Sequence, residues 1–187
     1  MIETYDILSP KQCNTIIDHF NNDKDRTPGQ VGANLVDITK KHSTDLGCSF
    51  DQSYQHNYND IIMPAINAGL IDYTAKYPYL LEGSEFSVYN DYNIQHYKHG
   101  EGYGVVHCET MPIKGNLKFI YRMMAWMIYL NDAVSGTYFP YQDVIIKPKE
   151  GMLVLWPSYW THVHRGVVPN VGDKYIATGW LNYTPDQ

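Results

Sequence analysis

The sequence contains no uninterrupted apolar run that approaches the roughly 20 residues needed for a membrane-spanning helix. Its opening, MIETYDILSP, also lacks a cationic segment followed by an apolar one, which argues against a secretory signal. These two absences predict a soluble protein that is not exported and has no membrane partner.

Cysteine is scarce in this chain. The three cysteines, Cys13, Cys48 and Cys108, are odd in number and show no CxxC spacing. They therefore suit reduced thiols better than a disulfide framework or a zinc site. We expect the protein to be found in a reducing cytoplasm.

Positive charge is in deficit, since Lys and Arg number 14 against 20 Asp and Glu, a formal net charge of -6 at pH 7. Such a chain has no broad attraction for nucleic-acid phosphates, so we expect no nucleic-acid partner. Linkers rich in Pro, Gly or Ser and internal repeats are missing as well, and 44% hydrophobic residues can fill one sizeable core. The expectation is a single domain over residues 1–187.

The first part of the chain predicts two helices and a long loop. Ser9 and Pro10 form a typical helix start, and apolar residues recur at helical spacing as far as Phe20. A second helix is expected from about Asn59 to Lys76, where apolar residues share one face. Residues 26–50 are polar and contain several glycines, so they predict a loop with room for a short strand, of the kind that often forms a lid.

After Gly83 the pattern changes to short runs rich in Val, Ile, Tyr and Phe that are separated by turn residues, such as FSVYNDYNIQHY, FIYRMMAWMIYL and KYIATGWLNY. Several short strands behind two helices predict an α+β chain that is mainly β. In this interpretation residues 1–83 supply helical support and a loop, and residues 84–187 form a sandwich or jelly-roll barrel.

The stretch GEGYGVVHCET places His107 and Glu109 two residues apart, directly after a glycine-rich turn. On a strand such residues point to the same face, so the imidazole and the carboxylate can reach one point. A second histidine from a distant strand would complete a two-histidine, one-carboxylate face for iron(II) with open positions. An HxE pair alone is a weak signal, but THVHRG downstream supplies the further histidines, His162 and His164.

Four segments resemble the catalytic domain of the iron(II)- and 2-oxoglutarate-dependent dioxygenases, in their prolyl 4-hydroxylase-like branch. They are YKHGEGYGVVHCE, MIYLND with GTYFP, PKEGMLVLWPS and HRGVVPNVGDKYIATGWL, within residues 84–183. The resemblance implies a double-stranded β-helix (jelly roll) that uses Fe(II), 2-oxoglutarate (2OG) and O2, with ascorbate as a candidate further cofactor.

Carried over by position, the resemblance makes His107 and Glu109 iron ligands. Most members of the family have aspartate at the second position, so glutamate adds one methylene. The family's basic residue for 2OG follows the distal histidine by ten residues, a spacing that leads from His164 to Lys174. His164 is therefore favoured as the distal ligand, and His162 stays the alternative.

The same resemblance assigns residues to the cosubstrate. Lys174 is expected to neutralise the distal carboxylate of 2OG, because a buried anion needs a cation and hydrogen bonds. Thr178 has the same strand parity and could donate a hydroxyl, and Tyr97 and Tyr129 are the expected phenol donors. For each tyrosine, ordinary packing is the competing interpretation, since the chain has 17 tyrosines.

The implied activity is hydroxylation of an unactivated C–H bond, in the first place of a prolyl residue in a peptide or protein. Arg165 and Trp180 are the candidates for contact with that substrate. Two alternatives stay open, namely a 2OG-dependent hydroxylase of a small molecule and a non-catalytic, cupin-like metal-binding module. The compact chain resembles the small bacterial and viral members of the family.

Overall fold

The computed structural model describes residues 1–32, 35–51, 58–111, 118–168 and 171–184. These residues form two α-helices, α1 (Pro10–Asn22) and α2 (Asn59–Lys76), and, later in the chain, three short 3-10 helices, η1 (Pro78–Leu81), η2 (Lys118–Tyr121) and η3 (Trp160–His162). The strands are β1 (Glu3–Asp6), β2 (Thr27–Pro28), β3 (Thr44–Ser49), β4 (Phe86–Val88), β5 (Asp91–Tyr97), β6 (Arg122–Tyr129), β7 (Thr137–Phe139), β8 (Val144–Ile146), β9 (Met152–Pro157), β10 (Arg165–Gly166) and β11 (Lys174–Tyr183).

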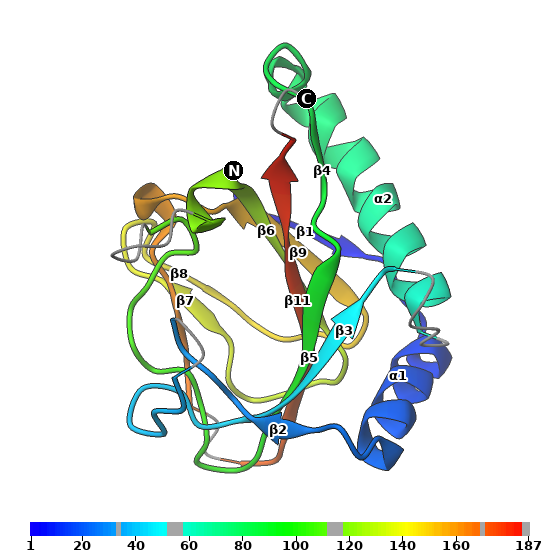
Figure 1. Cartoon of the computed structure of the whole chain (residues 1–187), viewed down its shortest axis with the longest axis vertical. Helices are drawn as coiled ribbons and strands as arrows, with labels where there is room; N and C mark the ends of the chain where they lie inside the picture. Colours follow the sequence, from blue (N-terminus) through cyan, green and yellow to red (C-terminus); the bar gives the residue numbers. More distant parts are fainter. Residues whose placement is uncertain (33–34, 52–57, 112–117, 169–170, 185–187) are drawn as a thin grey trace.

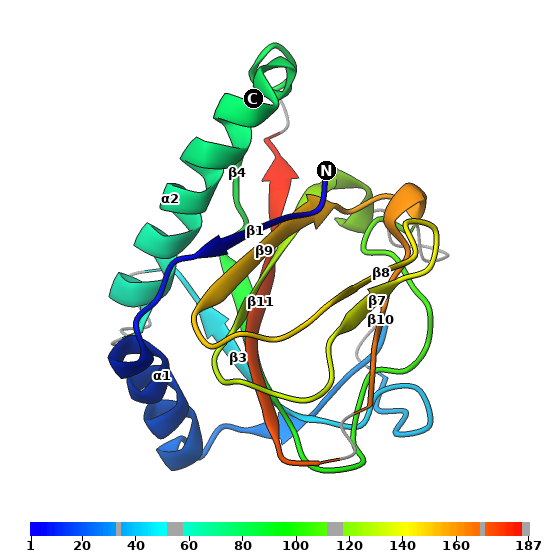
Figure 2. The ribbon, with the colours of Figure 1, turned by 180° about the vertical axis from the view of Figure 1, so that it is seen from behind.

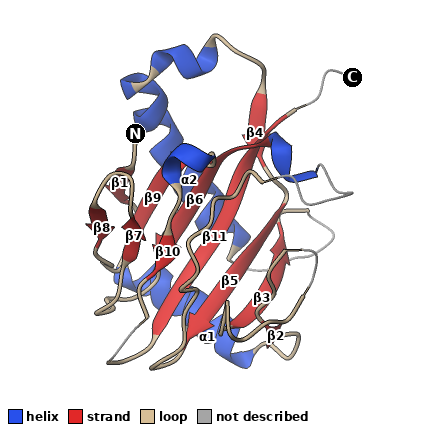
Figure 3. Ribbon diagram, turned by 90° about the vertical axis from the view of Figure 1, so that its left-hand side faces the viewer, coloured by secondary structure: helices blue, strands red, loops and turns tan. Residues whose placement is uncertain are grey.

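The strands form two antiparallel sheets. The large sheet has the order β1-β9-β6-β11-β5-β3-β2, with β4 also paired to β11, and the small sheet has the order β10-β7-β8. Figure 3 shows the large sheet face-on with the strands of the small sheet in front of it. This arrangement confirms the predicted jelly roll, mainly β with two N-terminal helices.

The helices and the small sheet lie on opposite sides of the large sheet (Figure 1 and, from behind, Figure 2). Alternate residues of β6 show the reason. Trp126 and Ile128 join the apolar cluster that includes the buried faces of both helices, whereas Met127 and Tyr129 join a second cluster with Phe139 of the small sheet. Period-2 alternation thus builds one core behind the large sheet and one between the sheets.

Both predicted helices are confirmed. At the start of α1, Ser9 and Gln12 form a capping box, in which the Gln12 backbone N–H donates to Ser9 Oγ at 3.4 Å and the Ser9 backbone N–H donates to Gln12 Oε1 at 2.9 Å. The helix buries Cys13, Ile16 and Phe20 against the large sheet. No helix formed by the described residues is long and apolar enough to cross a membrane.

The prediction for residues 1–83 requires a correction. Residues 1–83 do not supply only helices and a loop, because β1, β2 and β3 all belong to the large sheet. The predicted loop over residues 26–50 contains β3, which pairs with β5 along its whole length. It is the short strand for which the loop prediction left room, and its sequence, TDLGCS, is a weak strand signal because Asp45 and Gly47 face a cavity rather than an apolar core.

We predict that Gly151→Ala destabilises the fold by about 1–3 kcal/mol. Gly151 has φ +79°, and an added Cβ would lie 2.0 Å from the carbonyl oxygen of Leu8. The Gly151 carbonyl also accepts the backbone N–H groups of Ile7 and Leu8, so the turn between β1 and α1 depends on this contact. Gly83→Ala is the control, because no atom lies within 4 Å of its added Cβ. Urea unfolding measures both variants, and equal stabilities would contradict the prediction.

Candidate metal centre

An antiparallel bridge brings the two histidines of the predicted site together. The backbone N–H of His107 donates to the carbonyl of His164 at 2.9 Å, and the N–H of His164 donates back to His107 at 2.8 Å. The ladder expected around His107 and Glu109 is reduced to this single bridge within an irregular segment. One bridged pair is enough to place the two imidazoles side by side, with ring centroids 4.5 Å apart.

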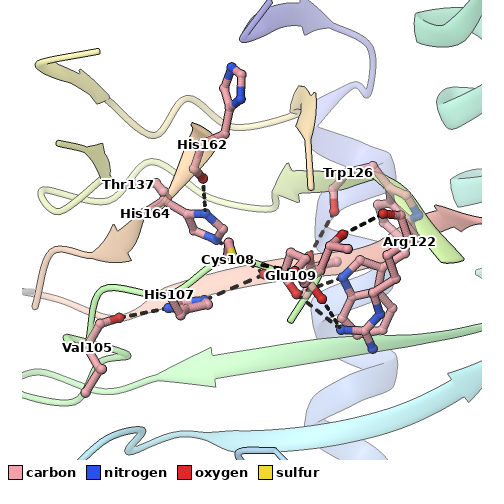
Figure 4. Close-up of polar contacts among 12 residues, drawn as sticks. Val105, His107, Cys108, Glu109, Arg122, Trp126, Thr137, His162 and His164 are labelled. Carbon is pink, nitrogen blue, oxygen red and sulfur yellow. Dashed lines mark hydrogen bonds and ion pairs between the residues drawn. The ribbon is translucent and has the colours of Figure 1, made fainter. Parts of the chain in front are cut away.

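The side chains of His107, Glu109 and His164 converge. Glu109 Oε1 lies 3.6 Å from His107 Nε2 and 3.3 Å from His164 Nε2, and one ligand atom from each residue lies within 4.8 Å of the others. Figure 4 shows the two rings and the carboxylate directed toward one another. Two imidazole nitrogens and one carboxylate oxygen match the donor set that a first-row metal such as iron(II) takes on one face.

Backbone carbonyls fix which ring nitrogen each histidine presents. His107 Nδ1 lies 2.8 Å from the carbonyl oxygen of Val105, and His164 Nδ1 lies 3.0 Å from that of His162. A carbonyl can only accept, so both Nδ1 atoms carry the proton. In the neutral ring Nε2 then offers its lone pair toward Glu109, which is how a metal-binding histidine is normally oriented.

His162 does not take part in this group of side chains. Its ring points away from Glu109 in Figure 4, and its Nδ1 lies 2.9 Å from the hydroxyl of Thr161. Burial lowers the pKa of His162, and the charges of the N-terminus and of His164 act in the same direction. The contribution of His162 to the site is its backbone carbonyl, which orients His164.

The second oxygen of Glu109 has partners of its own. Trp180 Nε1 donates to Oε2 at 2.8 Å, and Arg122 Nη1 lies 3.4 Å from the same oxygen. The Arg122 guanidinium carbon also lies 3.4 Å from the centre of the Trp180 ring, so the two side chains support each other. Sequence reasoning treated Trp180 as a substrate or wall residue and missed Arg122, whose one signal is a charge in the apolar run FIYRMMAWMIYL.

The environment of Glu109 stabilises its charged form. Burial by itself raises the pKa of Glu109, but whenever the two imidazoles carry a second proton on Nε2, their hydrogen bonds and charges outweigh burial, and the pKa of Glu109 lies well below its usual range. Burial likewise lowers the pKa of Arg122 to about 10, against the opposing charge of Glu109. The carboxylate is therefore ionised at neutral pH, as a metal ligand must be.

A cavity of about 720 Å³ adjoins the three side chains, and Lys174 lines it. Lys174 is 3% exposed, and no hydrogen bond or ion pair to it is found among the described residues. Its Nζ lies 4.8 Å from the centre of the Tyr97 ring, and burial lowers its pKa to about 8. A buried ammonium without a partner fits an anion that enters the cavity.

Two further residues that were predicted to bind the cosubstrate line the cavity but already have hydrogen-bond acceptors within the protein. Tyr97 lines the cavity, but its phenol donates to Gln95 Oε1 at 2.7 Å, and Thr178 lines it while donating to the Trp126 carbonyl at 2.9 Å. In both cases the hydroxyl proton that was expected to be donated to the cosubstrate is already donated to another group of the protein. Strand parity predicts the face that a side chain occupies, and it does not predict which neighbour takes its proton.

Two other predicted residues lie outside the described lining of the cavity. The Tyr129 hydroxyl lies 2.8 Å from Thr137 Oγ1, and of these two only Thr137 lines the cavity. The Arg165 guanidinium stacks on Tyr138, 5.4 Å from its ring centre. A residue that sequence reasoning missed is Tyr103, which lines the cavity and stacks on His107 at 3.9 Å.

Comparison with known proteins agrees with this geometry. Residues 92–182 match the model of the 2OG-Fe(II) oxygenase superfamily. Residues 92–182 therefore form a 2OG-Fe(II) oxygenase domain. The enzyme is thus a dioxygenase that uses Fe(II), 2OG and O2, and its His-Glu-His group fits the iron. Curated protein sequences give no match.

Several solved structures resemble this oxygenase in fold. The viral collagen prolyl hydroxylase of Paramecium Bursaria Chlorella virus-1, in complex with 2OG, has a TM-score of 0.68 at 18% identity, covering 98% of this chain and 96% of its own. A prolyl-4-hydroxylase of Pseudomonas putida has 0.68 at 17%, covering 98% and 92%. A Trichoplax adhaerens prolyl hydroxylase, in complex with a peptide fragment of the hypoxia inducible factor oxygen degradation domain, has 0.72 at 14%, covering 97% and 83%.

We predict that Trp180→Phe weakens metal binding to this oxygenase by about tenfold to a hundredfold. The substitution removes the N–H that holds Glu109 Oε2 and keeps an aromatic ring beside Arg122. Anaerobic titration with Co(II) against a competing chelator measures the affinity without turnover. Trp160→Phe is the matched control, since Trp160 is 69% exposed. Equal affinities for the two variants would contradict the role assigned to the indole.

Proposed function

We propose that this oxygenase hydroxylates prolyl residues in a peptide or protein, and that His107, Glu109 and His164 hold its iron. The observation that carries the proposal is the convergence of these three side chains beside a cavity that also contains an unpaired, buried Lys174. Iron(II), 2OG and O2, when bound there, supply the oxidation of an unactivated C–H bond with conversion of 2OG to succinate and CO2.

The protein's own groups orient and enclose the reactants. The carbonyls of Val105 and His162 hold the two imidazoles with Nε2 directed inward, and Trp180 holds the carboxylate of Glu109. Lys174 would hold the distal carboxylate of 2OG by charge, at a buried position of the cavity lining. None of these groups needs to move a proton to perform its role.

The shape of the cavity favours a substrate larger than a free amino acid. Beyond the metal-binding residues, the cavity continues over the inner face of β5 and β3 to Thr27 and Gln30 near β2. An extended peptide can lie along such a surface with alternate side chains directed into it. The structural neighbours named for prolyl hydroxylation and for a bound peptide fragment support the same substrate class.

Hydroxylation of a proline-rich peptide tests this proposal directly. The iron-loaded enzyme with 2OG is expected to add one oxygen atom to the peptide, as read by mass spectrometry, and to leave an alanine-substituted copy unchanged. His164→Ala should abolish the visible charge-transfer band of the iron–2OG chelate under anaerobic conditions, and His162→Ala should keep it. Turnover of 2OG that responds to free amino acids and never to peptides would overturn the peptide substrate.

We predict that binding of 2OG weakens as the pH rises above about 8. The pKa of Lys174 is lowered to about 8 by burial, so its ammonium is charged below that pH and loses its proton above it. Affinity should fall by up to about tenfold for each pH unit beyond this point.

Lys174→Arg is the matched variant for this prediction, because a guanidinium stays charged throughout the range. Its affinity for 2OG should be nearly constant from pH 7 to pH 9, as measured by anaerobic titration of the charge-transfer band. A wild-type affinity that is flat over the same range would show that Lys174 does not bind the cosubstrate.

A further inference from the structure

The inner face of the large sheet has an open, polar area beside the metal centre. Gly47 on β3, Asn93 on β5 and Thr178 on β11 are neighbours across the sheet, and all three line the cavity. Figure 3 shows these three strands side by side, with the helices behind them. Asp91, two residues before Asn93, lines the cavity as well. The opposite residues of β5, Tyr92 and Ile94, face the helix side of the sheet.

No described side chain fills or neutralises this area. A Cβ added at Gly47 would meet no atom within 4 Å, so there is free space above the strand. A glycine inside a strand often marks a place where a ligand approaches closely. Among the described residues, neither Asp91 nor Asn93 has a side-chain hydrogen bond or ion pair, and Asp91 is exposed to solvent.

The other charged side chains in the described lining of the cavity either have a partner of opposite charge or have a role in the proposed function. Lys41 pairs with Asp45, and Arg122 pairs with Glu109. Lys174 is the cation that the proposed function assigns to 2OG. Within the described lining, Asp91 is therefore the one carboxylate without a cation, in a protein whose net charge is already -6. The substrate side of the cavity thus favours a positive group.

Asp91 also lies close to the reacting end of the cavity. Tyr89, two residues earlier, donates its backbone N–H to the carbonyl of Trp180 at 2.8 Å. The indole of Trp180 in turn donates to Glu109. Asp91 therefore stands beside β11, whose Trp180 contacts Glu109, so a substrate group placed at Asp91 would belong to a residue near the oxidised one.

We propose that Asp91 and Asn93, with the space above Gly47, form a subsite for a lysine or arginine side chain near the target proline. This inference rests on the proposed function and specifies its substrate class as a basic peptide. Asp91 supplies the charge, Asn93 supplies a hydrogen-bonding amide, and Gly47 leaves room for the long side chain. Because Asp91 is exposed, water and salt screen its charge, and a modest, salt-sensitive preference results.

Three peptides that share one central proline test the subsite, with Lys, Gln or Glu at the flanking positions. We expect kcat/KM to decrease in the order Lys, Gln, Glu, with steps of about two- to fivefold at low salt. Asp91→Asn should remove most of the difference, and Asp91→Lys should reverse the order. A lysine preference that survives unchanged in both variants would overturn the proposal.

Asp72→Lys is the matched control for net charge. Asp72 is exposed on α2, on the far side of the large sheet from the cavity, so this variant should keep the wild-type order of peptides. A melting temperature, Tm, measured for each variant checks that it is folded. If Asp72→Lys lowers the lysine preference as much as Asp91→Lys does, the effect comes from overall charge, and the subsite is wrong.

Binding separates failure of the subsite from failure of the proposed function. Fluorescent copies of the three peptides are titrated anaerobically, with iron(II) and 2OG present, and followed by anisotropy. If no peptide is hydroxylated, prolyl hydroxylation is wrong, while a lysine preference in binding that Asp91→Asn removes still supports the subsite. Equal binding of all three peptides to the wild-type enzyme overturns the subsite even where hydroxylation occurs.

Discussion

The antiparallel bridge between His107 and His164 is the contact on which the rest of the site depends. Two backbone hydrogen bonds join segments that lie more than fifty residues apart in the sequence and place their imidazoles side by side. The carbonyls of Val105 and His162, in the same two segments, then fix Nδ1 as the protonated nitrogen of each ring. Backbone groups therefore perform both tasks, the alignment of the two imidazoles and the choice of tautomer.

Glutamate at position 109 connects this backbone frame to the substrate side of the cavity. Its length lets one carboxylate oxygen reach both imidazoles while the other reaches Trp180 and Arg122. Both of these partners line the same cavity, so the side chains that hold the carboxylate also form part of the cavity wall. Aspartate would be one methylene shorter, and the two sets of contacts could not be made at once without movement of the backbone.

Features of the fold that follow a repeated sequence pattern were predictable. Features that depend on the polar lining of the cavity were predicted less well. Apolar alternation and turn residues predicted the jelly roll, and Ser9 with Pro10 predicted the start of α1. Spacing favoured His164 over His162, and the structure places His164 in the converging group. Strand β3 was predicted only as a short strand within a loop, without bounds, because its inner face is polar where a core strand would be apolar. The partner of the Thr178 hydroxyl was not predictable, since parity fixes a face and many acceptors lie on it.

The described lining of the cavity contains two buried lysines, of which one is paired within the fold and the other is free to bind a ligand. Lys41 is neutralised by Asp45, which also accepts the hydroxyl of Ser43, so this charge is fully used within the fold. Lys174 is equally buried and has no such partner among the described residues, and its lowered pKa reflects the unfavourable desolvation. Because a bound carboxylate would relieve that desolvation and Lys41 has no charge to spare, an anion entering the cavity has one favourable position. Pairing one lysine and leaving the other unpaired thus supports the proposed position of 2OG at Lys174, and the charge left over in the described lining is the carboxylate of Asp91.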